Sequence, residues 1–135
     1  MKFIVCYEDA AVAKDTLKEA QKHAVKWNAF IEIIQAVKRE EPIKRSKLVE
    51  MEEDLEGTMA ELFDGLDIPY NVQLQIDDID VGEKIVELAN RKKADLIFIG
   101  IKKRSRVGKL LFGSTAQYVI LNALCPVVCI AKPKK

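Results

Sequence analysis

Five short apolar runs alternate with amphipathic segments along this chain, and no other feature of the sequence constrains the fold as much. The apolar runs are residues 2–7, 29–37, 70–76, 94–100 and 126–132. Between them, apolar residues recur every three or four positions, which predicts four helices. Strands that alternate with helices pair in parallel through right-handed crossovers. The pattern therefore predicts a doubly wound α/β fold of the flavodoxin-like kind, with a five-stranded parallel sheet in the order 3-2-1-4-5 and helices on both faces.

Local signals refine these segments. The first helix, 11–27, is expected to bury one face, and the charged stretch 38–47 is expected to be a surface loop. Strict alternation in 70–76 predicts a half-exposed strand near the sheet edge. Asp80 and Glu83 have the spacing of a capping box at the start of the third helix. The residues expected to be buried on the first and fourth helices are Ala13, Leu17, Ala20, Ala24 and Trp27, and Ala116, Val119, Ile120 and Ala123.

Length and cysteine use bound the class of protein. With 135 residues, 49% of them hydrophobic, the chain is predicted to form one domain, residues 1–135. Cys6, Cys125 and Cys129 lie in apolar runs, which suggests reduced, buried thiols and a cytoplasmic location. We expect no signal peptide, because acidic residues follow the first apolar stretch, and no membrane span. No metal-site spacing is present, and the single histidine, His23, is expected to be structural or solvated.

Charge is distributed unevenly along the chain, although the net charge is only +1. No Asp or Glu follows Asp95, whereas eight Lys and Arg do, so residues 96–135 carry +8. The first 95 residues therefore carry −7. An anionic ligand would be drawn to the C-terminal part.

The stretch 98–115, FIGIKKRSRVGKLLFGST, combines the features of a phosphate site. Gly100 ends the fourth predicted strand, five cationic residues follow, and Gly113-Ser114-Thr115 opens the fourth helix. The amides at a helix N-terminus favour an anion, and ligands of doubly wound sheets bind at the carboxyl ends of the strands. Two familiar phosphate motifs are absent, since Leu110 follows Gly108-Lys109 where a Walker A loop needs Ser or Thr, and no G-x-G-x-x-G occurs.

The spacing of these glycines resembles that of the universal stress protein family, whose signature is G-x2-G-x9-G-[ST]. Gly100 matches the first glycine and Gly113-Ser114 the last pair, and the resemblance extends over the whole chain. Lys103 occupies the middle glycine's position, and Glu8 stands where ATP-binding members usually have an aspartate. A branch of the family with a basic K/R-R-S-x-V-G-K loop is similar to residues 103–109, in which Gly108 supplies flexibility.

The resemblance implies an adenine-nucleotide-binding regulatory module of the stress response, with ATP, with or without Mg²⁺, as its ligand. It also implies a homodimer, and the apolar last strand, at the sheet edge in the inferred order, is where a second copy would pair. By carry-over, adenosine contacts are expected from Cys6, Tyr7, Glu8, Val37, Ile99 and Gly100. Phosphate contacts are expected from Lys103, Gly113, Ser114 and Thr115.

Other interpretations stay open. Ser114 to Gln117 also has the form of a capping box that needs no ligand, Tyr7 and Val37 could be ordinary core residues, and the basic run could be a solvated loop. Asp77, Asp78 and Asp80 are expected to cap a helix rather than bind metal. Nucleic-acid binding is disfavoured because the basic loop lacks interleaved aromatic residues.

An enzyme is not indicated. No nucleophile–base pair is apparent, although slow ATP hydrolysis through positioning by Mg²⁺ and the basic loop stays open. The alternative function is a member of the family that has lost nucleotide binding and acts as a dimeric interaction or scaffold protein.

Overall fold

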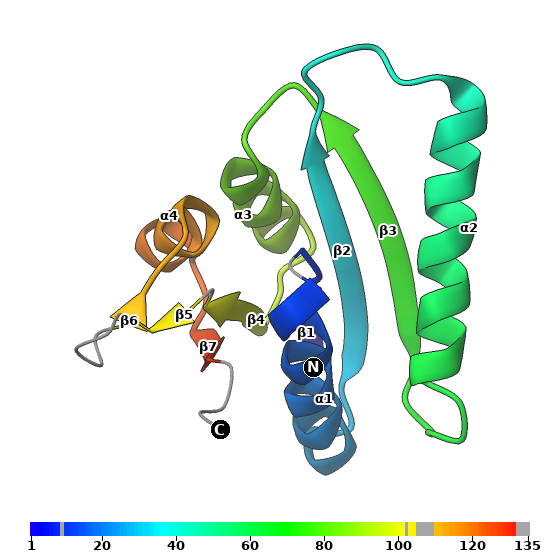
Figure 1. Ribbon diagram of the computed structural model, residues 1–135. Coiled ribbons are helices and arrows are strands. Elements are labelled where there is room, and N and C mark those ends of the chain that lie inside the picture. The colour runs from blue at the N-terminus through cyan, green and yellow to red at the C-terminus, as the bar shows by residue number, and fades with distance from the viewer. Residues whose placement is uncertain (9, 102, 105–109, 132–135) are drawn as a thin grey trace.

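The computed structural model describes residues 1–8, 10–101, 103–104 and 110–131. Five strands and four helices alternate as the sequence predicts, and a short two-stranded ribbon is added between β4 and α4 (Figure 1). The elements are β1 (Lys2–Cys6), α1 (Ala10–Trp27), β2 (Phe30–Lys38), α2 (Arg45–Leu62), β3 (Tyr70–Asp77), α3 (Val81–Arg91), β4 (Leu96–Ile101), β5 (Lys103–Arg104), β6 (Leu110–Leu111), α4 (Ser114–Asn122) and β7 (Val127–Ala131).

The main sheet has the order β3-β2-β1-β4-β7, and every neighbouring pair is parallel. This confirms the predicted five-stranded order 3-2-1-4-5. It also places β3 and β7 at the two edges, as predicted, and β1 beside β4 at the centre. The sheet reverses its winding between β1 and β4, so their carboxyl ends flank the switch point.

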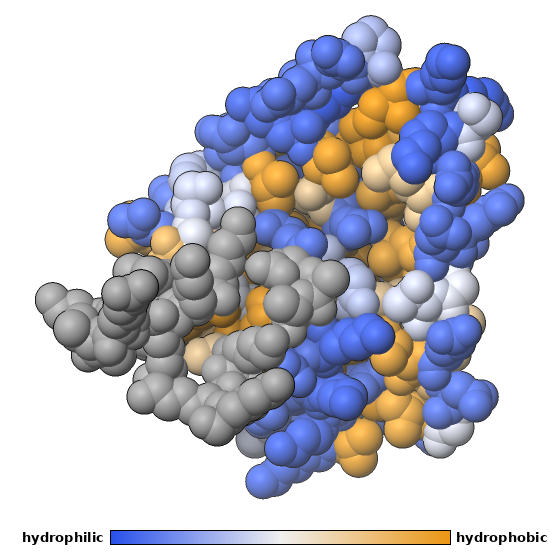
Figure 2. All heavy atoms as spheres, viewed as in Figure 1, coloured by the Kyte–Doolittle hydropathy of each residue, from blue (hydrophilic) through white to orange (hydrophobic). Residues whose placement is uncertain are grey.

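Two helices cover each face of the sheet, because successive side chains of a strand point to opposite faces. Phe3, Val5 and Phe98 pack against α1 and α2, while Ile4, Ile97 and Ile99 pack against α3 and α4. In Figure 1, α2 and α3 accordingly lie on opposite sides of β2 and β3. In the same view, the outer surface along α2 is mostly hydrophilic, and hydrophobic residues show nearer the centre of the molecule (Figure 2). The strands are therefore sandwiched, which explains their near-continuous apolar runs.

Several local predictions are wrong. Helix α2 begins at Arg45, within the stretch predicted as loop, because charged residues that precede the first apolar position also form helix. Trp27 is 58% exposed at the end of α1, and Ile120 is 40% exposed on α4. In the basic stretch, which the sequence predicts as a loop, the described residues Lys103–Arg104 and Leu110–Leu111 instead pair as the β5–β6 ribbon, with Lys103 opposite Leu111.

Neither predicted capping box forms. Asp80 does occupy the N-cap of α3, but its carboxylate accepts a hydrogen bond from Lys38 Nζ at 2.9 Å instead of bonding to the helix backbone. The neighbouring carboxylates also pair with cations, Asp77 with Lys84 at 3.1 Å and Asp78 with Arg39 at 3.2 Å. At α4 the N-cap is Gly113, which has no side chain, so Ser114 lies inside the helix.

The thiols and the histidine are placed mostly as expected. Cys6 is buried and His23 packs edge-on against Phe98, with ring centroids 5.6 Å apart. Cys125 and Cys129 are free thiols but only partly buried, with Cys129 in the edge strand β7 and Cys125 just before it. Within the described ranges, none of the helices is both long and apolar enough to span a membrane.

Candidate functional site

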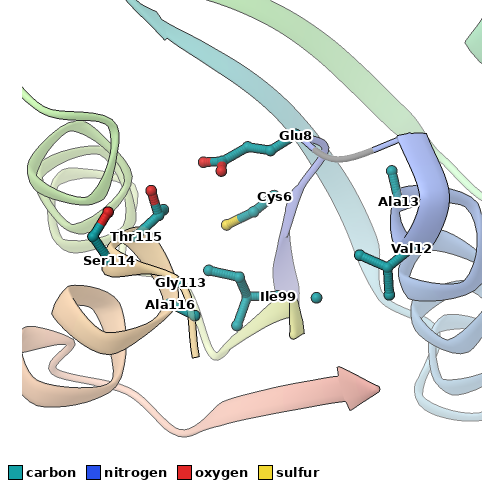
Figure 3. A pocket seen from close by; sticks show the side chains of 10 residues that line it. Cys6, Glu8, Val12, Ala13, Ile99, Gly113, Ser114, Thr115 and Ala116 are labelled. Carbon is teal, nitrogen blue, oxygen red and sulfur yellow. The ribbon is translucent and has the colours of Figure 1, made fainter. Parts of the chain in front are cut away.

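A narrow crevice opens at the switch point, between the end of β1 and the start of α4 (Figure 3). Its walls come from four parts of the chain: the end of β1, the first turns of α1, the end of β4 and the first turn of α4. Of the residues predicted from the sequence, seven line it together: Cys6, Glu8, Ile99, Gly100, Gly113, Ser114 and Thr115. Three further residues complete the lining: Val12, Ala13 and Ala116. Segments more than 100 residues apart therefore meet at one small site.

The first turn of α4 forms one wall of the crevice. Gly113 is the N-cap in extended conformation, and its carbonyl accepts the Gln117 amide at 3.0 Å. A glycine at the N-cap offers no side-chain hydrogen bond to the helix, so the amides of the first turn lack the usual N-cap partner. The partial positive charge at such an end attracts an anionic group, and the hydroxyls of Ser114 and Thr115 add hydrogen-bonding capacity.

Gly100 allows α1 to pack closely against β4. A Cβ added to it would overlap the Val12 Cγ1 atom and lie 3.1 Å from Thr16 Oγ1. Val12 and Ala13 thereby line the crevice from α1. This glycine is consequently required by packing, whether or not a ligand backbone contact also needs it.

Cys6 and Glu8 form the wall opposite α4. Burial, and to a lesser degree the nearby Glu8 carboxylate, raises the pKa of the Cys6 thiol well above its ordinary value. The thiol is therefore neutral and behaves as a small apolar group at neutral pH. The Glu8 side chain extends from the end of β1 over the crevice, toward the side on which Thr115 lies (Figure 3). A carboxylate there can accept hydrogen bonds from ligand hydroxyls.

Tyr7 and Val37 do not join these residues. Tyr7 continues the strand alternation, its amide donating to the Ile34 carbonyl at 2.9 Å, and it packs with the core on the α1–α2 face. There it lines a separate hollow with Gln35, Met51, Asp54, Leu55 and Thr58. Val37 is half-buried in β2, and the same alternation directs it toward that face. The resemblance to the family does not specify which face of the sheet each side chain occupies.

The basic stretch is described only in part. Lys103 lies in β5, and residues 102 and 105–109, with Gly108 among them, fall outside the described residues. The predicted contact of Lys103 with phosphate stays a prediction.

A second hollow adjoins the crevice on the side of α3 and shares Ser114 and Thr115 with it. Its other lining residues are Lys38, Asp80, Val81, Gly82 and Tyr118. A Cβ on Gly82 would lie 2.9 Å from Tyr118 Cβ, so this glycine lets α3 and α4 approach closely. Sequence analysis did not identify Lys38 or Tyr118 as site residues. For Lys38 a signal was available, since it ends β2 at the same sheet edge as the crevice.

Among the residues that the structure describes, no group of three or more His, Cys, Asp or Glu is arranged to hold a metal ion.

Fold and crevice together define a doubly wound parallel α/β domain with its candidate site at the switch point. Comparison with known proteins gives the family: residues 1–131 match the model of the universal stress protein family, and the chain belongs to that family. A universal stress protein of Methanocaldococcus jannaschii is 50% identical over 52 residues, which cover 38% of this chain and 31% of that relative. This chain thus aligns with less than a third of that relative's length.

Solved structures of family members have the same fold. A universal stress protein from Archaeoglobus fulgidus matches with a TM-score of 0.79 and 28% identity, covering 96% of this chain and 98% of that one. A universal stress protein from the same organism, solved in complex with dAMP, matches with a TM-score of 0.76 and 23% identity over 96% and 97% of the two chains.

Proposed function

We propose that this chain binds an adenine nucleotide, with ATP as the leading candidate, and acts as a nucleotide-responsive regulatory module of the stress response. The observation that carries the proposal is the switch-point crevice, into which the first turn of α4 opens from a glycine N-cap that has no side chain to bond its amides. Support also comes from the Archaeoglobus fulgidus family member whose structure contains dAMP. The +8 charge of residues 96–135 favours an anionic ligand over a neutral one.

Each part of the crevice has a role in this proposal. The phosphates would lie at Gly113, Ser114 and Thr115, where the amides of α4 meet them. Glu8 would accept hydrogen bonds from the ribose hydroxyls, beside Cys6 and Ile99 as apolar contacts. Tyr7 and Val37 would contribute through their backbone atoms, since their side chains belong to the other face.

Lys103 would add a cation at the phosphates, and Mg²⁺ would arrive with ATP, since phosphate oxygens and water are its usual ligands. If Lys103 makes this contact, Lys103→Ala weakens the binding of ATP more than the binding of AMP. If the lysine obstructs a close backbone approach instead, Lys103→Gly tightens the binding of ATP.

Calorimetric titration with ATP–Mg²⁺ and AMP tests the proposal directly. Binding to the native state releases or absorbs heat and raises the melting temperature by mass action. A purified sample denatured in acid should also release co-purifying adenine nucleotide. Absence of both heat and thermal shift at millimolar ligand would exclude nucleotide binding.

A homodimer through β7 is the second part of the proposal. This strand is an exposed edge of the sheet, and its residues Val127–Ala131 are only half-buried despite being apolar. Nearby, Leu121 and Leu124 are 74% and 84% exposed. An apolar edge strand pairs readily with a second chain. Light scattering should give about twice the chain mass of 15.3 kDa at micromolar concentration, and a monomer throughout that range would contradict it.

The alternative function, a dimeric interaction protein without nucleotide, predicts the dimer but no heat with ATP. Calorimetry with ATP and light scattering together therefore separate the candidates.

A further inference from the structure

The crevice is small compared with the hollow beside it. The crevice cavity is about 40 Å³, whereas the adjoining hollow is about 340 Å³. Small-molecule sites usually enclose roughly 300–1,000 Å³. A nucleotide held at Ser114 and Thr115 would therefore extend into the hollow, because these two residues line both spaces.

Lys38 is the cation in the lining of that hollow. Its Nζ atom forms an ion pair with Asp80 Oδ1 at 2.9 Å. Both side chains are substantially exposed, 47% for Lys38 and 66% for Asp80. Exposed ion pairs are weak, so an incoming anion can replace the carboxylate at little cost. The hydrogen bond from Lys38 to Asp80 raises the lysine pKa, with smaller contributions from Glu40 and Glu83, so the ammonium stays charged at neutral pH.

We infer that Lys38 is a specificity residue of this site: it exchanges Asp80 for the terminal phosphates of the bound nucleotide and so favours ATP over AMP. The inference rests on the proposed function. A charge-assisted hydrogen bond from an ammonium to phosphate strengthens with ligand charge. Asp80 then acts as the internal competitor that occupies Lys38 when no ligand is present.

The neighbouring pair of Arg39 and Asp78 provides a matched control. It likewise joins the segment after β2 to the segment between β3 and α3, and Arg39 Nη2 lies 3.2 Å from Asp78 Oδ1. Both side chains are exposed, at 43% for Arg39 and 73% for Asp78. Neither residue lines the hollow beside Ser114 and Thr115. Substitution of this pair therefore changes the local charge by the same amount without touching the proposed contact.

The experiment is calorimetric titration of ATP–Mg²⁺ and AMP into the full chain and five variants. These variants are Lys38→Gln, Asp80→Asn, the double variant of both, Arg39→Gln and Asp78→Asn. We expect Lys38→Gln to weaken ATP about fivefold and AMP less than about twofold. We expect Asp80→Asn to tighten ATP about threefold, since it frees Lys38, and the two control variants to stay within about 1.5-fold of the parent.

The double variant tests whether Asp80 acts through Lys38. In the Lys38→Gln background, Asp80→Asn should have no larger effect than Asp78→Asn has in the parent. High salt should shrink the Lys38→Gln penalty for ATP. Loss of packing or folding would weaken both nucleotides and could not produce tighter binding by Asp80→Asn.

Two outcomes would overturn the inference. One is equal behaviour of the Lys38–Asp80 and Arg39–Asp78 variants, and the other is equal weakening of ATP and AMP by Lys38→Gln. Both leave nucleotide binding by the parent protein intact, so they refute the role of Lys38 alone. Failure of the parent to bind either nucleotide would instead refute the proposed function, and this inference with it.

Discussion

The buried carboxylate of Glu32 lies 2.9 Å from the Lys92 ammonium, at the end of the sheet opposite the crevice. Glu32 sits within β2 with only 3% of its side chain exposed, and Asn71 Nδ2 also donates to it at 2.7 Å. Lys92 is the C-cap residue of α3. This pair therefore links α3 to the face of the sheet. Removal of Lys92 would leave the buried Glu32 charge uncompensated, which is strongly destabilising.

We predict that Lys92→Met lowers the free energy of unfolding by about 2–4 kcal/mol, because it leaves a buried carboxylate without its counter-charge. Glu32→Gln combined with Lys92→Met should lose less, since a neutral amide can still bond to Asn71. Urea denaturation measures both. Lys22→Met removes an exposed helical pair and serves as the control. A loss for Lys92→Met no larger than that of the control would refute the account of this pair.

Gly100 gives a second prediction. Gly100→Ala should destabilise the fold by about 1–3 kcal/mol, because the new methyl group overlaps Val12. Adding Val12→Ala should restore part of that loss by making room. Thermal unfolding of the single and double variants checks this, and an unaffected Gly100→Ala variant would show that α1 does not pack against β4 as described.

The Cys6 thiol predicts a loss of stability at alkaline pH. Burial, then the Glu8 charge, raises its pKa in the folded state above its ordinary 9.0, so the folded chain holds this proton more tightly than the unfolded chain does. The associated stability is present in full below pH 9.0 and is lost as the pH rises toward the folded pKa. The free energy of unfolding, measured from pH 8 to pH 10.5, should therefore fall less steeply in Cys6→Ala. Cys129→Ala, at a less buried thiol, should change the slope less, and identical slopes in all three proteins would contradict the assignment.

Leu124, next to the proposed β7 dimer edge, gives a fourth prediction. Leu124→Arg should shift the population to monomer in sedimentation experiments, since it places a charge on a surface that the second copy would cover. Its melting temperature at high dilution should match the parent, because the side chain is 84% exposed in the single chain. A dimer of unchanged affinity would place the interface elsewhere.

Strand–helix alternation and the handedness of crossovers predict a doubly wound parallel sheet from the sequence, and the order 3-2-1-4-5 is one of the orders that obey both. Seven of the ten expected site residues also meet at one crevice, since the carboxyl ends of β1 and β4 are brought together by that order. The side-chain direction of Tyr7 could not be predicted, because β1 is apolar on both faces and its sequence does not show which helices each face meets.

The partners of side chains in tertiary contacts could not be predicted from the sequence either. Glu32 lies between two isoleucines in an ordinary strand pattern, and its partner Lys92 is 60 positions away in the chain. The sequence predicts Asp80 at the N-cap of α3, and the structure confirms it. The ion pair of its carboxylate with Lys38 depends on the end of β2 lying beside α3, which the local sequence does not show. Contacts between distant segments, rather than local propensity, decided each of these cases.

The central claim is that an adenine nucleotide binds in the crevice between β1 and α4, and an NMR titration with ATP–Mg²⁺ tests it at the level of single residues. We predict that the largest amide shift changes fall on Glu8, Ser114, Thr115 and Ala116, with a further change at Lys38. No shift change at millimolar ATP, or changes confined to the hollow lined by Tyr7, Asp54 and Thr58, would contradict it.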